Sequence, residues 1–454
     1  MATIKTSSFI KPADPTPNHR LWLSDPDLLQ PATHSPLVYF YTPNNMYTTN
    51  FFSPQVIKSS LSRALVHFYP LAGRLCRDDT GRLEIDCNAA GVNFVDAESD
   101  AKISDFGDFM PSQELRNLFP YIDYNTHVGD WPLLLVQLTK FSCSGVCMAI
   151  AFSHVVFDSL VFMQFISMWS GISRGSTSDL IMEMVYDRTV LRAREPPAAP
   201  AFDHEEFKPP HRLMDGDDNR NKETAIAVVK LTREQVNSIR RAADDGKARC
   251  SRYEAVAGHL WRCACKARGL RGDQPTKLYI TVNGRTRLRP PVPVGYVGNA
   301  VFTVAAVASS GDLVSNSVSY SASRIREVMK KVDDEYLSSA LDFFNGQTNL
   351  TSLRRGFDLM DPDPEVGAYH ESPNLMLTSW EGIRLYEADF GWGQPIHVGP
   401  ALVGFEGRGF IMPASEGDGS VVVALKLRAE IIKSFMELVY DYEPTLVPQI
   451  SSRL

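Results

Sequence analysis

The chain has 454 residues, of which 44% are hydrophobic and 22% charged, and its formal net charge is -7. This length exceeds what one hydrophobic core organises, so it predicts roughly two or three domains. The acidic balance argues against a general nucleic-acid binder, and no apolar run approaches the ~20 residues of a membrane span. Because the N-terminus lacks the apolar core of a secretion signal, we expect a cytoplasmic protein with neither membrane nor nucleic-acid partners.

The seven cysteines are scattered, and the closest pairs are Cys143/Cys147 and Cys263/Cys265. Neither pair has the C-x-x-C spacing of a zinc or redox site. We therefore expect reduced cysteines that pack as small apolar side chains.

The first part of the chain alternates helix and strand patterns. The expected elements are a helix that starts at Ser53-Pro54, a half-buried strand over 83–87, two strands over 133–141 and 146–152 joined by a turn, and a buried helix over 160–169 that Asp158 caps. Proline suits the first helical position, and an aspartate before a helix accepts hydrogen bonds from its free amides. The strands follow from apolar runs bounded by turn residues.

Residues 188–223 differ in composition, because they are rich in proline and polar residues. This composition predicts an interdomain linker that runs over the surface. We therefore divide the chain into an N-terminal domain, 1–187, the linker, and a C-terminal domain, 224–454.

The C-terminal domain also mixes strands and helices. Its expected elements are strands over 224–231 and 420–427, helices opened by the capping boxes Thr232-x-x-Gln235 and Ser251-x-x-Glu254, and a helix over 429–440. In a capping box the two side chains bond each other's backbone amides. The sequence thus predicts two α/β domains of similar size.

His154 follows the apolar run 146–152, and Asp158 stands four residues later. A histidine at the end of a buried strand, with one ring nitrogen fixed and the other facing a cavity, has the geometry of a general base. The same spacing also fits a core histidine satisfied by hydrogen bonds. A metal site needs a third ligand, which no second cluster of this kind supplies. A Ser-His-Asp hydrolase is disfavoured because Ser153 adjoins His154.

The second constellation is Asp389-Phe390-Gly391-Trp392-Gly393, in which two glycines allow a tight backbone path around a tryptophan. H-x-x-x-D followed far downstream by D-F-G-W-G resembles the signature pair of the plant BAHD acyltransferases. The resemblance extends over nearly the whole chain, with supporting stretches at 68–74, 257–262, 284–287 and 295–299. Within the family the chain looks closest to the hydroxycinnamoyltransferases, through 38–41, 97–99 and 106–109.

The resemblance implies an α/β fold of two chloramphenicol-acetyltransferase-like domains with a channel between them, open to acyl-CoA on one side and to the acceptor on the other. It implies catalytic positions at His154, Asp158 and Asp389, with His154 as the general base. Asp158 is expected to turn away from substrate and pair with Arg285. Asp389 is expected to hold an interdomain loop with Gly391, Trp392 and Gly393, although the family often counts it as catalytic. CoA contacts are assigned to Ser251 and Arg252.

The implied reaction suits a thioester, whose carbonyl is already activated. His154 takes a proton as the acceptor attacks, donors near the carbonyl stabilise the oxyanion, and the CoA thiolate leaves. The resemblance implies acyl-CoA as co-substrate, no metal or other cofactor, and a monomer acting on small molecules.

The chain departs from the family at two positions near the base. Ser159 stands where glycine is common, and it would cost about a kcal/mol or more if that position needed φ > 0. Asn283 stands where an aspartate commonly precedes Gly-Arg. These departures keep open a non-catalytic relative that binds acyl-CoA.

Two clues to the acceptor conflict. Arg355-Gly356 shortly before Thr378-Ser379-Trp380 resembles the shikimate- and quinate-using members, in which the arginine grips the acceptor carboxylate. His34 and Tyr39 match polar positions of that acceptor pocket, whereas Leu37 replaces a hydroxyl.

Longer stretches resemble the spermidine hydroxycinnamoyltransferases, at 65–70, 88–92, 97–109, 202–204 and 261–269. The segment between Gly356 and Asn374 is also acidic, and its carboxylates are Asp358, Asp361, Asp363, Glu365 and Glu371. Carboxylates near a channel mouth suit a polycation. We therefore expect hydroxycinnamoyl transfer to an amine such as spermidine, with transfer to shikimate or quinate as the alternative.

Overall fold

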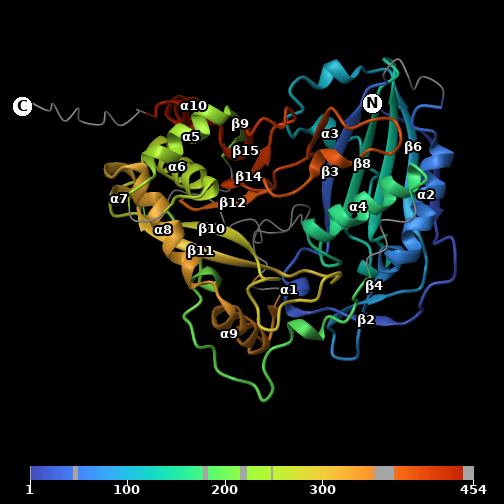
Figure 1. The fold of residues 1–454 in the computed structure, drawn as a ribbon, viewed down its shortest axis with the longest axis horizontal. Helices are drawn as coiled ribbons and strands as arrows, with labels where there is room; N and C mark the ends of the chain where they lie inside the picture. The colour runs from blue at the N-terminus through green and yellow to red at the C-terminus, as the bar shows by residue number, and fades with distance from the viewer. Residues whose placement is uncertain are drawn as a thin grey trace, which may run out of the picture.

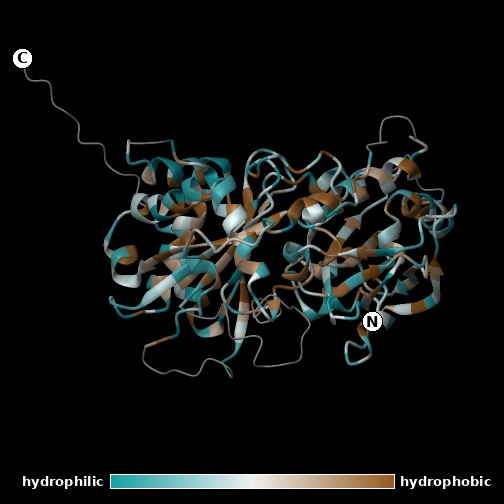
Figure 2. Ribbon diagram, turned by 90° about the horizontal axis from the view of Figure 1, so that it is seen from below, coloured by the Kyte–Doolittle hydropathy of each residue, from teal (hydrophilic) through white to brown (hydrophobic). Residues whose placement is uncertain are grey.

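The computed structural model describes residues 2–43, 50–176, 183–214, 222–246, 249–350, 353 and 373–442. Within these residues, two mixed six-stranded sheets lie in two lobes placed side by side along the long axis of the molecule (Figure 1). The sequence is hydrophobic along many strands of both lobes and more polar along the loops around them (Figure 2).

The first sheet has the strand order β1-β6-β7-β8-β3-β13. Its strands are β1 (Thr3–Ile10), β3 (His34–Tyr41), β6 (Val92–Ser99), β7 (Leu134–Phe141), β8 (Val146–Ser153) and β13 (His397–Pro400). β6 and β7 run parallel, and the other neighbours in this sheet are antiparallel. The small sheet β2-β5-β4 lies in the same lobe and consists of β2 (Arg20–Trp22), β4 (Arg74–Arg77) and β5 (Leu83–Asp86).

The second sheet has the order β11-β10-β12-β14-β15-β9. Its strands are β9 (Thr224–Leu231), β10 (Pro275–Asn283), β11 (Val301–Ser309), β12 (Leu375–Ser379), β14 (Arg408–Pro413) and β15 (Val421–Arg428). β12 is parallel to both of its neighbours.

Helices cover the sheets in each lobe (Figure 1). In the first lobe they are α1 (Asp25–Leu28), α2 (Pro54–His67), α3 (Gln113–Arg116) and α4 (Ser159–Ser173). In the second they are α5 (Arg233–Ala242), α6 (Arg252–Ala267), α7 (Ser310–Ser315), α8 (Val318–Lys331), α9 (Asp334–Asn345) and α10 (Ile432–Tyr440). Short 3-10 helices are η1 (Tyr69–Ala72), η2 (Ile103–Phe106), η3 (Val128–Asp130), η4 (Thr189–Leu191), η5 (Glu205–Phe207), η9 (Leu385–Glu387) and η10 (Ala429–Ile431). No helix in the described part of the chain is both long and apolar enough to cross a membrane.

Local signals in the sequence predict these elements well. α2 has proline in its first turn, and both expected capping boxes open their helices, at Thr232 for α5 and at Ser251 for α6. The two central strands β7 and β8 and the buried helix α4 also stand where the apolar runs predict them. All seven cysteines are unpaired, and five of them are buried.

Two features differ from the expected organisation. β13 comes from the C-terminal half of the sequence, yet it pairs with β3 in the first sheet. The segment 188–223 is also not confined to the surface, because Arg188, Leu191, His204 and Glu206 are buried. The expectation of a surface linker is therefore wrong for these four residues. Arg188, His204 and Glu206 are buried with hydrogen-bond or ion-pair partners for their polar groups.

Candidate active site

A cavity of about 410 Å³ lies between the two large sheets. The first lobe contributes Pro36 from β3 and the loop around His154, and the second contributes side chains of β10, β11, β12 and β14. This volume falls in the range of small-molecule sites.

His154 lies in the turn between β8 and α4, directly after the last strand residue, and its side chain lines the cavity. Burial is the largest cause and lowers the pKa of its imidazole below the usual 6.5. The positive charge of Arg408 acts in the same direction, and the negative charge of Asp158 opposes it. The ring is therefore neutral near pH 7, as a general base requires. Its Nδ1 is buried with no hydrogen-bond partner in the described part of the chain, so the expected fixed ring nitrogen is not found there.

Asp158 is buried and turned into the protein, as expected. Its carboxylate accepts hydrogen bonds from both terminal nitrogens of Arg285, at 2.7 and 3.2 Å, and from the backbone amide of Ala300 at 3.0 Å. It also caps α4 by accepting from the Val161 amide. The expected pair with Arg285 is present, and it ties the start of α4 to a loop of the second lobe.

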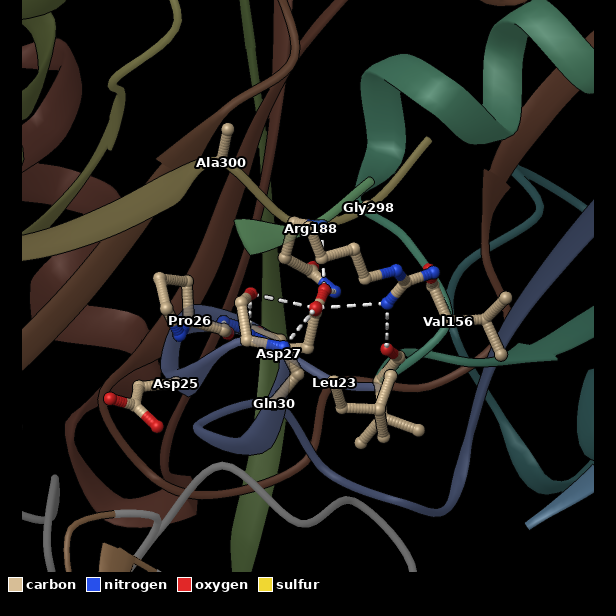
Figure 3. A network of polar contacts seen from close by, with 12 residues as sticks. Leu23, Asp25, Pro26, Asp27, Gln30, Val156, Arg188, Gly298 and Ala300 are labelled. Atoms are coloured by element: carbon tan, nitrogen blue, oxygen red, sulfur yellow. Dashed lines mark hydrogen bonds and ion pairs between the residues drawn. The ribbon is translucent and has the colours of Figure 1, made fainter. Parts of the chain in front are cut away.

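Figure 3 shows a second buried ion pair, between Asp27 and Arg188. The guanidinium of Arg188 lies 2.9 Å from Asp27, both side chains are fully buried, and Arg188 donates to the carbonyl of Val156 at 2.7 Å. Asn299 donates to Asp27 and, at 2.9 Å, to the carbonyl of His154. We call Asp27, Asp158, Arg188, Arg285 and Asn299 the paired network.

The paired network fixes the backbone that carries the base, because it binds the carbonyls of residues 154 to 156 from two sides. The sequence does not single out Asp27 or Arg188, and it marks Asn299 only as the end of a family-like stretch. These three residues are far apart in the chain and only the fold brings them together.

Thr378 and Trp380 line the cavity, as expected for substrate contacts. Thr378 shares a hydrogen bond of 3.2 Å with Thr281, and the Trp380 ring packs on Phe410 with centroids 4.8 Å apart. Arg355 and the five acidic residues of the 356–374 segment lie outside the described residues.

His34 and Tyr39 were expected in the acceptor pocket, but neither lines the cavity. Both ring nitrogens of His34 are engaged, with the Tyr124 hydroxyl at 2.8 Å and the Pro132 carbonyl at 2.6 Å, and burial lowers its pKa to about 4. Tyr39 is fully buried in the first core, where burial raises its pKa and its hydroxyl faces the Met163 sulfur. Acceptor binding by these two residues therefore stays a prediction, and the neighbouring residues that line the cavity are Ser35 and Pro36.

The Asp389 loop is held by its own aspartate. The carboxylate accepts from the amides of Gly391 and Gly393, at 2.8 and 2.9 Å, and both glycines have positive φ. Arg174 donates to the Asp389 carbonyl, and Trp392 packs on Phe52 with ring centroids 4.9 Å apart. Asp389 does not line the cavity, so its place in the structure is that of a residue shaping the loop rather than touching the reacting atoms.

Ser251 and Arg252 also stand outside the cavity lining. Ser251 caps α6, while Arg252 binds Glu381 at 2.8 Å and the Gly419 carbonyl at 2.7 Å. Glu381 lies between the lining residues Trp380 and Gly382, so Arg252 stands beside one edge of the cavity. A role in CoA binding stays a prediction.

The two departures near the base cause no strain. Ser159 begins α4 and is not among the described residues with positive φ, so the condition under which serine would be costly is not met. Asn283 accepts a hydrogen bond of 3.1 Å from the Arg285 amide through its side-chain oxygen.

Comparison with known proteins identifies the family. The family model described as "Transferase family" matches residues 1–441. A shikimate O-hydroxycinnamoyltransferase of Nicotiana tabacum is 44% identical over 446 residues, which cover 97% of this chain and 99% of the relative. A hydroxycinnamoyl-CoA:5-hydroxyanthranilate N-hydroxycinnamoyltransferase of Avena sativa is 39% identical over 452 residues, with 97% and 99% covered. The crystal structure of vinorine synthase shares the fold, with a TM-score of 0.72, 23% identity and 96% of each chain covered.

The fold is thus that of two chloramphenicol-acetyltransferase-like domains, and the protein is an acyltransferase. The chain belongs to the BAHD acyltransferase family.

Proposed function

We propose that this acyltransferase moves a hydroxycinnamoyl group from its CoA thioester to a small acceptor, with His154 as the general base. The observation that carries the proposal is a histidine, neutral because of its burial, on the wall of a cavity of about 410 Å³ between two domains. Relatives of about 40% identity that are named hydroxycinnamoyltransferases support the acyl group.

The reaction needs one base and no covalent intermediate. His154 takes the proton of the acceptor O–H or N–H as that atom attacks the thioester carbonyl carbon. The new bond forms, the C–S bond breaks, and the CoA thiolate receives the proton from His154. The hydroxyls of Thr378 and Ser379 line the same cavity, and we assign them as donors for the oxyanion.

The geometry favours an acceptor that carries a carboxylate. Asp158 is the acidic side chain among the described lining residues, and both of its oxygens are already bonded. A polyamine would therefore meet no available carboxylate on this part of the wall. The relatives from tobacco and oat are named for shikimate and 5-hydroxyanthranilate, which are both carboxylic acids.

An amine such as spermidine stays the second candidate. It is supported by the resemblance of several sequence stretches to spermidine hydroxycinnamoyltransferases and by the acidic residues between Gly356 and Asn374 in the sequence. The oat relative is named for N-acylation, which supports an amine nucleophile but on an acid.

The proposal is tested by incubating the protein with coumaroyl-CoA and a mixed pool of shikimate, quinate, 5-hydroxyanthranilate and spermidine, and reading products by mass. We expect one acyl conjugate and acceptor-dependent consumption of the thioester. Binding of coumaroyl-CoA without consumption, whatever the acceptor, would instead indicate the non-catalytic relative.

A further inference from the structure

Arg408 opens β14, and its side chain lines the same cavity as His154. It makes no hydrogen bond or ion pair with any described residue, and its Nη1 is buried without a partner. The contact that it does make is with the face of the Phe410 ring, whose centroid lies 4.8 Å from the guanidinium carbon. An arginine placed in this way has donors left over for a ligand.

The carboxylates near Arg408 are already committed elsewhere. Glu406, two residues earlier, binds Arg268 at 2.7 Å, and both of those side chains are buried. Asp158 binds Arg285. The described lining therefore carries one positive charge that no neighbouring acid offsets.

Arg408 keeps its charge at neutral pH although burial lowers its pKa to about 10. Removing a charge from water without a partner is unfavourable, so an anion that enters the cavity is bound partly because it relieves this desolvation. A guanidinium also matches the planar fork of a carboxylate.

We propose that Arg408 binds the carboxylate of the acceptor and so selects hydroxy or amino acids over polyamines. This inference rests on the proposed function. Arg408 and His154 line the same cavity from the two lobes and are close enough for the arginine charge to lower the histidine pKa. An acceptor with its nucleophile at His154 and its acid group at Arg408 therefore spans the space between them.

The phosphates of CoA are the other source of negative charge, but the pantetheine arm separates them from the thioester that must reach His154. The arginine that lies beside the base is better placed for the acceptor. Spermidine would meet repulsion at this position, because its charge has the same sign as that of the guanidinium.

The experiment compares Arg408→Met, Arg408→Lys and the control Arg384→Met, which removes an exposed arginine outside the cavity lining. The co-substrate is coumaroyl-CoA. The acceptor is whichever of shikimate, quinate and 5-hydroxyanthranilate the wild type acylates fastest, tested alongside its neutral methyl ester. The ester keeps the nucleophile and removes the charge.

We expect Arg408→Met to lower kcat/KM for the acid by about 10- to 100-fold, mostly through KM, because it removes charge-assisted hydrogen bonds. The ester should change less than about 3-fold, the KM of coumaroyl-CoA should stay constant, and Arg408→Lys should restore part of the loss because it keeps the charge without the fork. Binding of the acid is also measured without turnover, by titrating it into His154→Ala and into the double variant His154→Ala/Arg408→Met. The double variant should bind the acid more weakly, by a factor similar to the rise in KM.

Several outcomes would overturn this assignment. An equal loss for acid and ester would place Arg408 on the oxyanion or in the fold, and a raised KM for coumaroyl-CoA alone would place it on the CoA phosphates. A wild type that prefers spermidine to all three acids would also overturn it. Failure of the proposed function gives a different result, because the wild type would then consume no coumaroyl-CoA with any acceptor.

Discussion

The cavity is bordered by two regions that handle charge in opposite ways. In the paired network, Asp27, Asp158, Arg188 and Arg285 all bond one another or the backbone. On the facing strands β12 and β14, Arg408 has no such partner in the described part of the chain. Charges that are paired with an opposite charge hold a backbone in one geometry, whereas an unpaired charge is available to bind a ligand. The difference separates residues that position the base from residues that select the acceptor.

The largest expected effect comes from replacing His154, the base that lies between these two regions. His154→Ala should lower kcat by about 10²- to 10⁴-fold, because no other described lining residue offers a neutral imidazole to take the proton. Turnover of coumaroyl-CoA measures the loss, and calorimetry should show that coumaroyl-CoA still binds. His67→Ala, at the exposed end of α2, is the control and should keep full activity. Wild-type turnover by His154→Ala would refute the general-base mechanism.

Arg188→Met breaks the paired network at its most buried point. The variant leaves Asp27 buried without its cation, which should lower the free energy of unfolding by about 3–5 kcal/mol. It also frees the Val156 carbonyl behind His154, so kcat should fall for every acceptor alike. Urea unfolding and steady-state kinetics measure the two effects.

The matched control for that variant is again Arg384→Met. The pair of Arg384 with Glu387 is exposed, and breaking it should cost less than about 1 kcal/mol. Equal stability of Arg188→Met and the wild type would show that the paired network does not hold the site together.

Local and distant features of these regions differ in how far the sequence predicts them. The strand-turn-helix around His154, the cap at Asp158 and the two capping boxes follow from neighbouring residues, and the Asp158–Arg285 pair follows from the family resemblance. The Asp27–Arg188 pair joins residues 161 positions apart (188 − 27), and no local pattern specifies such a contact.

The surroundings of single side chains on β3 and β14 are equally hard to predict from local patterns. His34 and Tyr39 both belong to β3, and the groups that their side chains contact lie at least 90 residues away in the sequence. The sequence around Arg408 has an ordinary strand pattern. Only the structure shows that the nearby Glu406 binds Arg268 and does not pair with Arg408. Likewise, β13 joins the first sheet because the 380–403 segment packs against that core, through Trp380, Leu385, Phe390, Val398 and Val403.

The unpaired charge of Arg408 should also affect the pH dependence of the reaction, because it lowers the pKa of the base His154. Burial lowers the His154 pKa and Arg408 lowers it further, so the neutral base persists below pH 6.5 and the acid limb of kcat/KM should lie under that value. Arg408→Met removes the positive charge that lowers the His154 pKa, so its acid limb should move to higher pH. The profile is measured with the neutral methyl ester, whose binding does not depend on Arg408. Arg384→Met should leave the limb in place, and a limb that moves to lower pH in Arg408→Met would contradict the charge effect.

The smallest expected effect concerns Ser159, which lies on the cavity wall where the paired network meets α4. If serine were strained here, Ser159→Gly would stabilise the protein by about 1 kcal/mol or more. The residue instead begins the helix without positive φ, so we expect glycine to leave the free energy of unfolding unchanged or lower it by up to about 1 kcal/mol. Urea unfolding measures the difference, with Ser319→Gly in the first turn of α8 as the reference for a serine that has no family-specific role. A clear gain in stability for Ser159→Gly alone would show that the start of α4 is strained after all, and that the paired network holds it in that state.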